Sequence, residues 1–451
     1  MLIAEAKLRP NAKKGLVTNV FSLGVVQIAN YVFPFITVPI VSRIIGPDRL
    51  GVLNFSSAFM AYFTLLINFG FDLSATRAIA ANRDNLEERN KVFNQVILAK
   101  VLLFSISIIF FLCALFLMPQ FGHEKPVAIF SFLICFSWVI TPNWLYQGMQ
   151  ELSRIALFNM CTKVLFTVVI LLVVREKSDY IWQPLVISVA QIIVGVFSFT
   201  YAIKRYKIHL KLMKLKPVLH LLWNERIIFF SMVVINLYTT TNVVLLGFLQ
   251  NPTQVGYYTA GWRLIMIVQT LISIPLGQAL FPFIGSAFGQ GRDKGLNIVR
   301  QVFPIVLSIT ASASILLFIF GPTTVSIVYG AKFQPTVLVF RVLAFIPMMI
   351  SISNLLGMQT MINLKMDKIF LRITAFGAIT SLLLNFILVK KFGFVGTAWS
   401  WLLTETFIVI AMFYTLTKNN IYVLDRKYFA IEHFKKYLKP IFLSVKQKII
   451  K

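Results

Sequence analysis

Five charged residues lie inside long apolar segments, where a charge is difficult to accommodate. Four are cations, Lys100, Lys163, Arg263 and Arg341, and one is an anion, Glu405. A charge at the centre of a membrane helix costs about 2.5–3.5 kcal/mol on insertion scales, so such residues commonly face a cavity or a partner. A cavity lined mainly by cations would favour an anionic ligand such as a phosphate or pyrophosphate. The four cations are therefore candidate ligand-binding residues.

Several charges also have a simpler explanation. Lys100 and Lys163 lie near one end of their apolar segments, where a long lysine side chain can extend to the membrane surface. Arg43, Asp72 and Arg77 lie at segment ends, where charge is less costly. Asp72 and Arg77 can cap a helix and pair locally, so we assign them to ion pairing or coupling. Arg43 completes the set of candidate binding cations.

Glu405 lies in the middle of the last apolar segment and cannot easily reach water. We expect it either to pair with an embedded cation or to change its protonation state, which would couple function to protons, to a cation or to the membrane potential. The three cysteines and four histidines are scattered and lack the spacing of metal ligands. We therefore predict no metal site and no other cofactor.

The composition of the chain restricts its class. Of its 451 residues, 58% are hydrophobic and 13% are charged, and its mean hydropathy is +0.80. Soluble domains are about 45–50% apolar and about 25% charged, so a soluble enzyme, a disordered chain and a nucleic-acid module are excluded. The net charge of +27 comes mainly from basic residues between apolar runs, which is typical of cytoplasmic loops. No nucleic-acid partner is expected.

Hydropathy predicts an all-α, polytopic membrane protein with about twelve transmembrane helices. We expect them near 16–42, 51–71, 93–118, 127–149, 156–174, 181–203, 227–249, 261–287, 302–320, 336–359, 369–389 and 396–417. The loops on the side of the termini hold 31 of the 43 lysines and arginines, and the opposite loops hold 8. This asymmetry predicts that both termini are cytoplasmic.

Two basic segments separate and follow the apolar parts. Residues 204–226 and 418–451 interleave lysines and arginines with leucine, isoleucine and aromatic residues. Such segments are typical of amphipathic helices on an anionic leaflet, so anionic lipids are expected partners. The predicted organisation is a six-helix lobe at 1–203, a cytoplasmic linker at 204–226, a second six-helix lobe at 227–417 and a basic tail at 418–451.

The two predicted lobes share short motifs. The turn Pro47–Gly51 recurs as Pro252–Gly256 at an offset of 205, with two polar residues and one apolar residue between the proline and the glycine. Gly148-Met149-Gln150 recurs as Gly357-Met358-Gln359 at an offset of 209. The nearly constant offset indicates a duplication of six helices in the same orientation. Paired lobes of this kind are typical of transporters.

Three stretches carry a resemblance to a known family. They are Pro39–Gly51, Asn68–Arg77 and Tyr257–Pro282, which includes Arg263 and Pro275-Leu276-Gly277-Gln278. In these stretches the chain resembles the polysaccharide transporter, or O-antigen (Wzx-type) flippase, family of the multidrug/oligosaccharidyl-lipid/polysaccharide flippase superfamily. The resemblance extends over about residues 15–417.

The resemblance implies a protein of the bacterial inner membrane that is not an enzyme. Such a protein translocates undecaprenyl-pyrophosphate-linked oligosaccharide units, of O-antigen or capsular type, by alternating access between two lobes. It also implies a polysaccharide polymerase and a chain-length regulator as partners. Arg263 matches an arginine that lipid II flippases place in their central cavity. Two further C-terminal helices of lipid II flippases have no counterpart among the predicted spans, which favours a glycan repeat unit as substrate.

Three other functions remain open at this stage. A multidrug or metabolite exporter of the same superfamily is the nearest, but carriers of cationic drugs should embed acidic residues, and residues 16–42 contain none. An O-antigen polymerase or ligase has similar hydropathy but carries a large periplasmic loop, which the short outer loops here do not provide. A purely structural scaffold would not explain the embedded charges.

Overall fold

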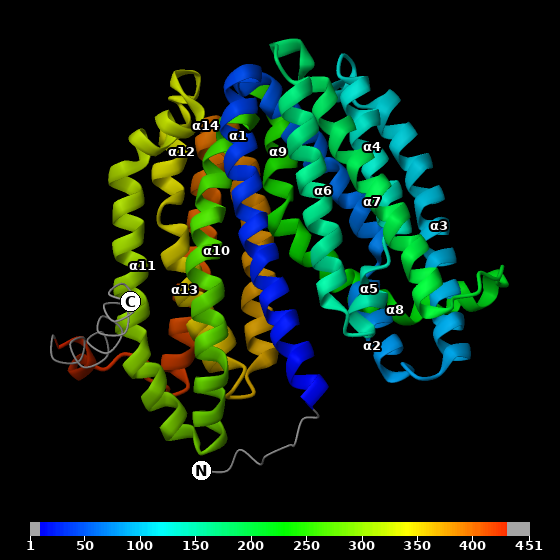
Figure 1. Cartoon of the computed structure of the whole chain (residues 1–451). Coiled ribbons are helices and arrows are strands. Elements are labelled where there is room, and N and C mark those ends of the chain that lie inside the picture. Colours follow the sequence, from blue (N-terminus) through cyan, green and yellow to red (C-terminus); the bar gives the residue numbers. More distant parts are fainter. Residues whose placement is uncertain (1–9, 431–451) are drawn as a thin grey trace, which may run out of the picture. The chain divides into compact units, whose positions relative to one another are not determined.

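The structure is a computed structural model and describes residues 10–430, all of whose regular elements are helices (Figure 1). The first half contains α1 (Pro10–Asn68), α2 (Phe71–Ala81), α3 (Leu86–Leu117), α4 (Lys125–Ile140), α5 (Asn143–Gly148), α6 (Leu152–Val173), α7 (Trp182–Tyr206), α8 (Leu215–Thr239) and α9 (Thr241–Leu249). The second half contains α10 (Pro252–Gly289), α11 (Arg292–Tyr329), α12 (Thr336–Leu343), α13 (Ile346–Leu356) and α14 (Asp367–Lys418). Short helical turns are η1 (Pro119–Phe121), η2 (Lys177–Ile181), η3 (Ala331–Phe333), η4 (Gly357–Met361) and η5 (Arg426–Phe429).

The two longest helices each contain two of the predicted spans. In α1 the chain turns at Gly46, which has φ 78°, and in α14 it turns at Gly393, which has φ 55°. Only glycine adopts this left-handed backbone without steric cost, so a glycine marks each reversal. The backbone angles at Gly46 and Gly393 are not helical, so α1 and α14 each consist of two helical arms that meet at a turn.

The all-α membrane fold is confirmed by the helices and by how they bury their residues. In the described part of the chain, nine helical segments are long and apolar enough to cross a membrane. Large apolar side chains point outward, with Phe116 at 71% and Leu117 at 79% exposure, whereas Ser107 and Ser188 are fully buried. Apolar side chains on the outside and small polar side chains inside are expected of a multi-pass protein surrounded by lipid. The count of twelve spans and the cytoplasmic location of the termini stay predictions.

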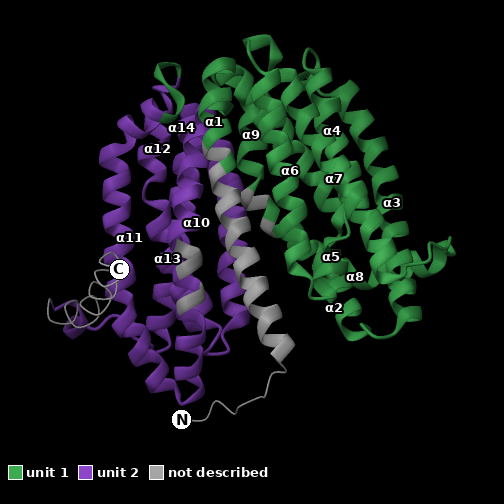
Figure 2. Cartoon of the chain, in the orientation of Figure 1, with its two compact units in different colours: residues 1–256, 328–332 green, residues 257–327, 333–451 purple. Residues whose placement is uncertain are grey.

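The chain forms two compact units (Figure 2). Unit 1 consists of residues 1–256 and 328–332, and unit 2 of residues 257–327 and 333–451, with residues 1–9 and 431–451 outside the described part. Residues 227–256, which we assigned to the second lobe, thus belong to unit 1. The greater part of the predicted basic tail, 431–451, lies outside the described residues.

The predicted linker 204–226 is not one continuous helix. Helix α7 ends at Tyr206, and α8 begins at Leu215. Between them the chain is fixed to α3 by asparagine side chains: Asn94 Oδ1 accepts from the Lys211 N–H at 3.0 Å, and Asn90 Oδ1 accepts from the His209 N–H at 2.7 Å. The basic side chains of this segment are exposed, as expected for the surface of an anionic leaflet: Lys204, Arg205, Lys207, Lys211, Lys214 and Lys216.

Small polar residues bring the helices of unit 1 together. Ser188 on α7 donates to the Phe130 carbonyl on α4 at 2.8 Å, and Ser137 on α4 donates to Gln191 Oε1 on α7 at 3.1 Å. In lipid, apolar burial provides little force between helices, so close packing and such hydrogen bonds determine which helices associate. Unit 2 uses the same device where Ser400 donates to the Ser381 carbonyl at 3.1 Å, which joins the two arms of α14.

The repeated turns predicted from the sequence contact each other within unit 1. A methyl group added at Gly51 would overlap the Pro252 carbonyl, and one added at Gly256 would overlap the Pro47 carbonyl. Each glycine therefore lies against the proline of the other turn, which is the reciprocal contact of a pseudo-twofold arrangement. The glycines are required here because any side chain would separate the two backbones.

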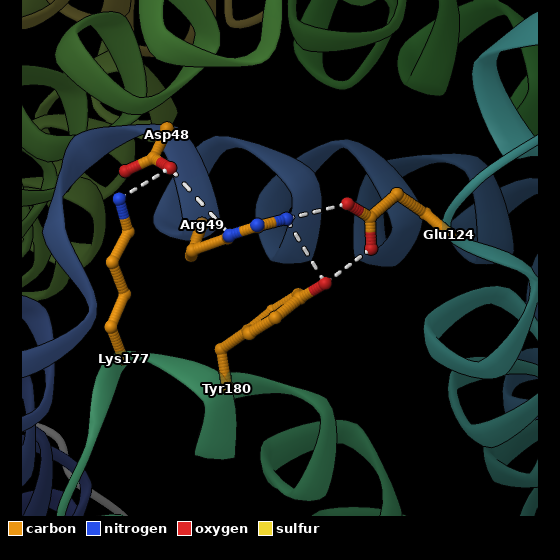
Figure 3. A network of polar contacts seen from close by, with 5 residues as sticks. All are labelled: Asp48, Arg49, Glu124, Lys177 and Tyr180. Carbon is orange, nitrogen blue, oxygen red and sulfur yellow. Dashed lines mark hydrogen bonds and ion pairs between the residues drawn. The ribbon is translucent and has the colours of Figure 1, made fainter.

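A network of ion pairs joins three predicted outer loops of unit 1 (Figure 3). Arg49 Nη1 is 2.7 Å from Glu124 Oε1, and the Tyr180 hydroxyl donates to Glu124 Oε2 at 2.6 Å. The Arg49 guanidinium also lies over the Tyr180 ring at 4.6 Å, and Lys177 pairs with Asp48 at 2.9 Å. The network holds the α1 turn, the start of α4 and η2 together.

We predict that Gly51→Ala and Gly256→Ala each destabilise the protein by about 1–3 kcal/mol, because the added methyl meets backbone that no side-chain rotation can move. Thermal unfolding of the purified protein in lipid nanodiscs measures the effect. Gly289→Ala is the matched control, since no atom lies within 4 Å of its added methyl. Equal melting temperatures for all three variants would contradict the close contact.

We also predict that the Arg49–Glu124 pair has a coupling free energy of about 1 kcal/mol or more, because the pair is partly buried and shares Tyr180. A double-mutant cycle of Arg49→Ala and Glu124→Gln, measured by unfolding, gives this value. The exposed pair Lys91–Glu88 serves as the control, with an expected coupling of about 0.3–0.5 kcal/mol. Additive effects of Arg49→Ala and Glu124→Gln would refute the network's contribution.

Candidate functional site

A polar cavity of about 360 Å³ lies among α2 to α7 of unit 1. It brings together three residues that the sequence singled out: Asp72, Lys100 and Lys163. Six other lining residues carry an amide or a hydroxyl: Ser137, Thr141, Asn143, Asn159, Thr162 and Gln191. The rest of the lining is apolar or aromatic or is glycine: Trp138, Phe158, Ile187, Val194 and Gly195. It is the candidate functional site.

Lys100 reaches this cavity from α3 and is only 1% exposed. Its ammonium donates to the Trp138 carbonyl at 3.1 Å. In a continuous helix that carbonyl would accept from the N–H of residue 142, but residue 142 is a proline and has none. The proline therefore ends α4 at Ile140 and leaves a backbone acceptor, which the buried lysine uses.

Asp72 lies in the first turn of α2, where the helix dipole favours a carboxylate. Asn68 donates to Asp72 Oδ2 at 2.7 Å. Asp72 is also the acidic group whose charge acts on Lys100. Among the described residues no ion pair within 4 Å joins Asp72 to Lys100, so the carboxylate offsets part of the positive charge of the cavity without direct contact.

Lys163 enters from α6 and is partly buried. Asn159, Thr162 and Lys163 are spaced by three and four residues, so they share one helix face, which the cavity shows to be polar. On the opposite wall, Gln191 of α7 accepts from Ser137, which fixes the orientation of its amide. Two lysines and one aspartate give the cavity one excess positive charge. Such a site can hold an oxyanion through charge-assisted hydrogen bonds.

The other predicted residues of unit 1 lie elsewhere. Arg43 on α1 is exposed and lies beside Gly330, with its Nε 3.8 Å from where a Cβ of that glycine would be. Arg77 on α2 is exposed as well. Among the described residues no ion pair joins Asp72 to Arg77, and Asn68 is the neighbour that bonds Asp72 instead.

The remaining three predicted residues lie in unit 2, on different helices. Arg263 is a partly buried residue of α10. Arg341 of α12 places its guanidinium over the Phe318 ring at 5.3 Å. Glu405 of α14 is 8% exposed and accepts a hydrogen bond from the Trp401 side chain one turn earlier. Within residues 10–430 no ion pair joins Glu405 to a cation. The other expected role, a change of protonation state, stays a prediction.

The uncharged polar residues of the cavity were not predicted. Asn159 and Thr162 could have been found, because polar residues three or four positions from an embedded lysine mark one face of an apolar helix. Asn143 and Gln191 carry no such signal. In the described part of the chain, no group of three or more histidine, cysteine, aspartate or glutamate residues could hold a metal ion.

Comparisons with known proteins agree with this architecture. The chain is 29% identical over 412 residues to a protein of Escherichia coli (strain K12) named "Putative O-antigen transporter", which covers 91% of this chain and 99% of that protein. A protein of the same name from Shigella dysenteriae is 28% identical, covering 87% of this chain and 98% of its own length. The chain spans nearly the whole length of both relatives.

Two solved structures share the fold. The lipid II flippase MurJ in an inward closed conformation superposes with a TM-score of 0.64 at 16% identity, covering 92% of this chain and 88% of that chain. An inward-facing multidrug resistance MATE family transporter of the MOP superfamily also gives 0.64, at 14% identity, covering 89% of this chain and 98% of that chain. These relatives and neighbours are transporters and flippases, not enzymes.

The family description "Polysaccharide biosynthesis protein" matches residues 16–288. This stretch contains the repeated turns, the outer ion-pair network and every residue of the polar cavity. Because the match covers more than half of the chain, this multi-pass membrane protein belongs to the polysaccharide biosynthesis protein family.

Proposed function

We propose that this protein is a flippase for undecaprenyl-pyrophosphate-linked oligosaccharide units of O-antigen or capsular type in the bacterial inner membrane. The observation that carries the proposal is the cavity in unit 1 that contains Lys100, Lys163 and Asp72. A polar cavity with excess positive charge inside a lipid-embedded unit suits an anionic head group whose tail remains in lipid. The names of the two bacterial relatives support the same substrate class.

The residues have distinct roles in this proposal. The ammonium of Lys163 binds a pyrophosphate oxygen, and Asn159 and Thr162 on the same helix face donate to further oxygens. Lys100 holds the wall through the Trp138 carbonyl and contributes positive charge. Arg263, Arg341 and Arg43 are the further cations along the path of the head group.

Alternating access moves the head group, while the polyprenyl chain stays in the bilayer. The proposed lobes, 1–203 and 227–417, rearrange around the substrate. Glu405, together with Asp72 and Arg77, couples the cycle to protons, to a cation or to the membrane potential. The exposed basic segment after α7 contacts anionic lipids. A polymerase and a chain-length regulator receive the product on the far side.

Export of cationic drugs is the second candidate, because a MATE transporter shares the fold. The charge of the cavity argues against it. A cationic substrate would meet two lysines and a single carboxylate. The cavity therefore favours the anionic substrate.

We predict that deletion of the gene abolishes the surface glycan and leaves complete lipid-linked oligosaccharide in the inner leaflet, because synthesis continues while translocation stops. Glycan analysis of whole cells and mass spectrometry of extracted lipids measure the two quantities. A plasmid copy should restore both. Normal glycan without accumulation would reject the flippase, and drug-efflux assays would then test the exporter.

We predict that Lys163→Gln lowers translocation about tenfold or more, because the loss of a charge-assisted hydrogen bond costs about 1.5–3 kcal/mol. Complementation of the deletion strain, normalised to protein in the membrane fraction, measures the loss. Lys163→Arg retains the charge and should keep much of the activity. The matched control is Lys91→Gln on α3, which is exposed and pairs with Glu88. Equal activity of Lys163→Gln and Lys91→Gln would exclude Lys163 from the site.

A further inference from the structure

A second cavity, of about 570 Å³, lies in unit 1 and shares no residue with the first. Its wall comes from the second arm of α1, from the loop and helix start at 119–128, and from the end of α9 with the turn into α10. These loops are the ones that the distribution of lysine and arginine places on the side opposite the termini. We call it the outer cavity.

The outer cavity combines aromatic side chains with amide groups. Phe55, Phe121 and Phe248 line it, and the Phe55 ring centroid lies 5.7 Å from that of Phe121 and 5.6 Å from that of Phe248. Gln120 and Asn251 line the same space. Sugar rings present apolar C–H faces and a rim of hydroxyls, which are donors and acceptors at once. Phe55 and Phe121 are buried, but Phe248 is 37% exposed and can cover an apolar sugar face. Amide groups, which have both a donor and an acceptor, match the hydroxyls.

Glu124 contributes a carboxylate whose position is fixed. It accepts from Arg49 at 2.7 Å and from the Tyr180 hydroxyl at 2.6 Å, and it lines the outer cavity (Figure 3). A carboxylate has about four lone-pair sites, so acceptor capacity remains for ligand hydroxyls. Arg49 compensates its charge from outside the lining.

The wall also contains a buried hydroxyl. Ser56 is 2% exposed, and its Oγ has no hydrogen-bond partner within the described residues. An unsatisfied buried hydroxyl is costly and uncommon in a native structure. Ser56 belongs to the lining of the cavity, and its hydroxyl adds to the polar character of the wall beside Phe55.

The charge of the lining separates this cavity from the first. The described residues that line it include no lysine or arginine, so it offers a pyrophosphate no compensating cation. Its polar groups would be left unsatisfied by an acyl chain. A sugar uses both the aromatic faces and the polar groups, and the volume lies within the range of ligand pockets.

We infer that the outer cavity binds sugar residues of the glycan on the periplasmic side, as a site for the oligosaccharide separate from the site for its pyrophosphate. The inference rests on the proposed function, which supplies a glycan on that side of the membrane. The exposed Phe248 ring contacts a sugar ring, the buried Phe55 ring supports Phe248, and Gln120, Asn251 and Glu124 bond the hydroxyls.

The test is protection of a single cysteine from labelling. Cys113, Cys135 and Cys161 are replaced by serine or alanine, and His123→Cys is introduced at the exposed rim of the cavity. The probe is the oligosaccharide released by mild acid from the wild-type strain's own lipid-linked units. We expect millimolar probe to slow labelling by a membrane-impermeant maleimide at least threefold, in spheroplasts and in nanodiscs.

Ser178→Cys provides the matched control, because it is exposed in another outer loop and does not line the cavity. Its labelling should not change. Adding Gln120→Ala and Asn251→Ala to His123→Cys should abolish the protection, while labelling without probe continues. Unprotected His123→Cys, equal protection of both cysteines, or labelling of His123→Cys only from the cytoplasmic side would each overturn the inference.

The two proposals fail in different ways. If the cysteine variant restores surface glycan in the deletion strain but shows no protection, the sugar site is wrong and the flippase stands. If deletion of the gene leaves the glycan normal, the proposed function fails, whatever the labelling experiment gives.

Discussion

The bond between the Lys100 ammonium and the Trp138 carbonyl is the interaction on which the candidate site depends. A lysine buried in a membrane protein needs an acceptor, and helices normally have none to offer because their carbonyls are used internally. Pro142 removes one N–H from α4 and leaves this carbonyl available. The same interruption ends α4 and lets α5 begin as a separate helix at Asn143, which lines the cavity. One proline thus provides both the acceptor for the charge and the irregular wall beside it.

Close backbone contact plays the corresponding part at the outer end of unit 1. Gly51 and Gly256 let two turns of the same sequence pattern meet at their proline carbonyls, and the Arg49 network joins the neighbouring loops. Lipid supplies no apolar force between helices, so such contacts carry much of the specificity of packing. Close backbone contacts and ion pairs therefore hold the outer end together. Hydrogen bonds between α4 and α7 hold the region of the polar cavity together.

Hydropathy and spacing predicted most of the fold and part of the site. The apolar runs locate helices because a backbone in lipid must form its hydrogen bonds internally. The turns at Pro47–Gly51 and Pro252–Gly256 share a residue pattern, which indicated that they are related. The cost of an embedded charge identified Lys100 and Lys163, and Asp72 was a candidate for ion pairing at the end of a segment, but nothing in the sequence said that the three share one cavity. Whether they do depends on which face each helix turns toward its neighbours. A helix that is apolar on all sides gives little sequence signal of that orientation. The Trp401 partner of Glu405 was also missed, because an indole one turn away looks like an ordinary membrane aromatic.

The two cavities of unit 1 differ in charge, as the pyrophosphate and the sugars of a glycolipid head group do. The first has two lysines, one aspartate and several amides, and it lies among helices that lipid surrounds. The second has aromatic side chains, of which Phe248 is exposed, together with amides and a carboxylate whose charge is compensated by Arg49. It lies at loops predicted to be on the outer side. A charged pyrophosphate has a large desolvation free energy and needs cations to offset it. Sugars need hydrogen-bond partners for their hydroxyls and an apolar surface for their ring faces. If one unit recognises both parts at separate places, the charged part can be released while the glycan is still held. The head group then moves toward the outer side by leaving a pyrophosphate site of moderate affinity while a sugar site of moderate affinity still holds the glycan. A single tight site would slow release.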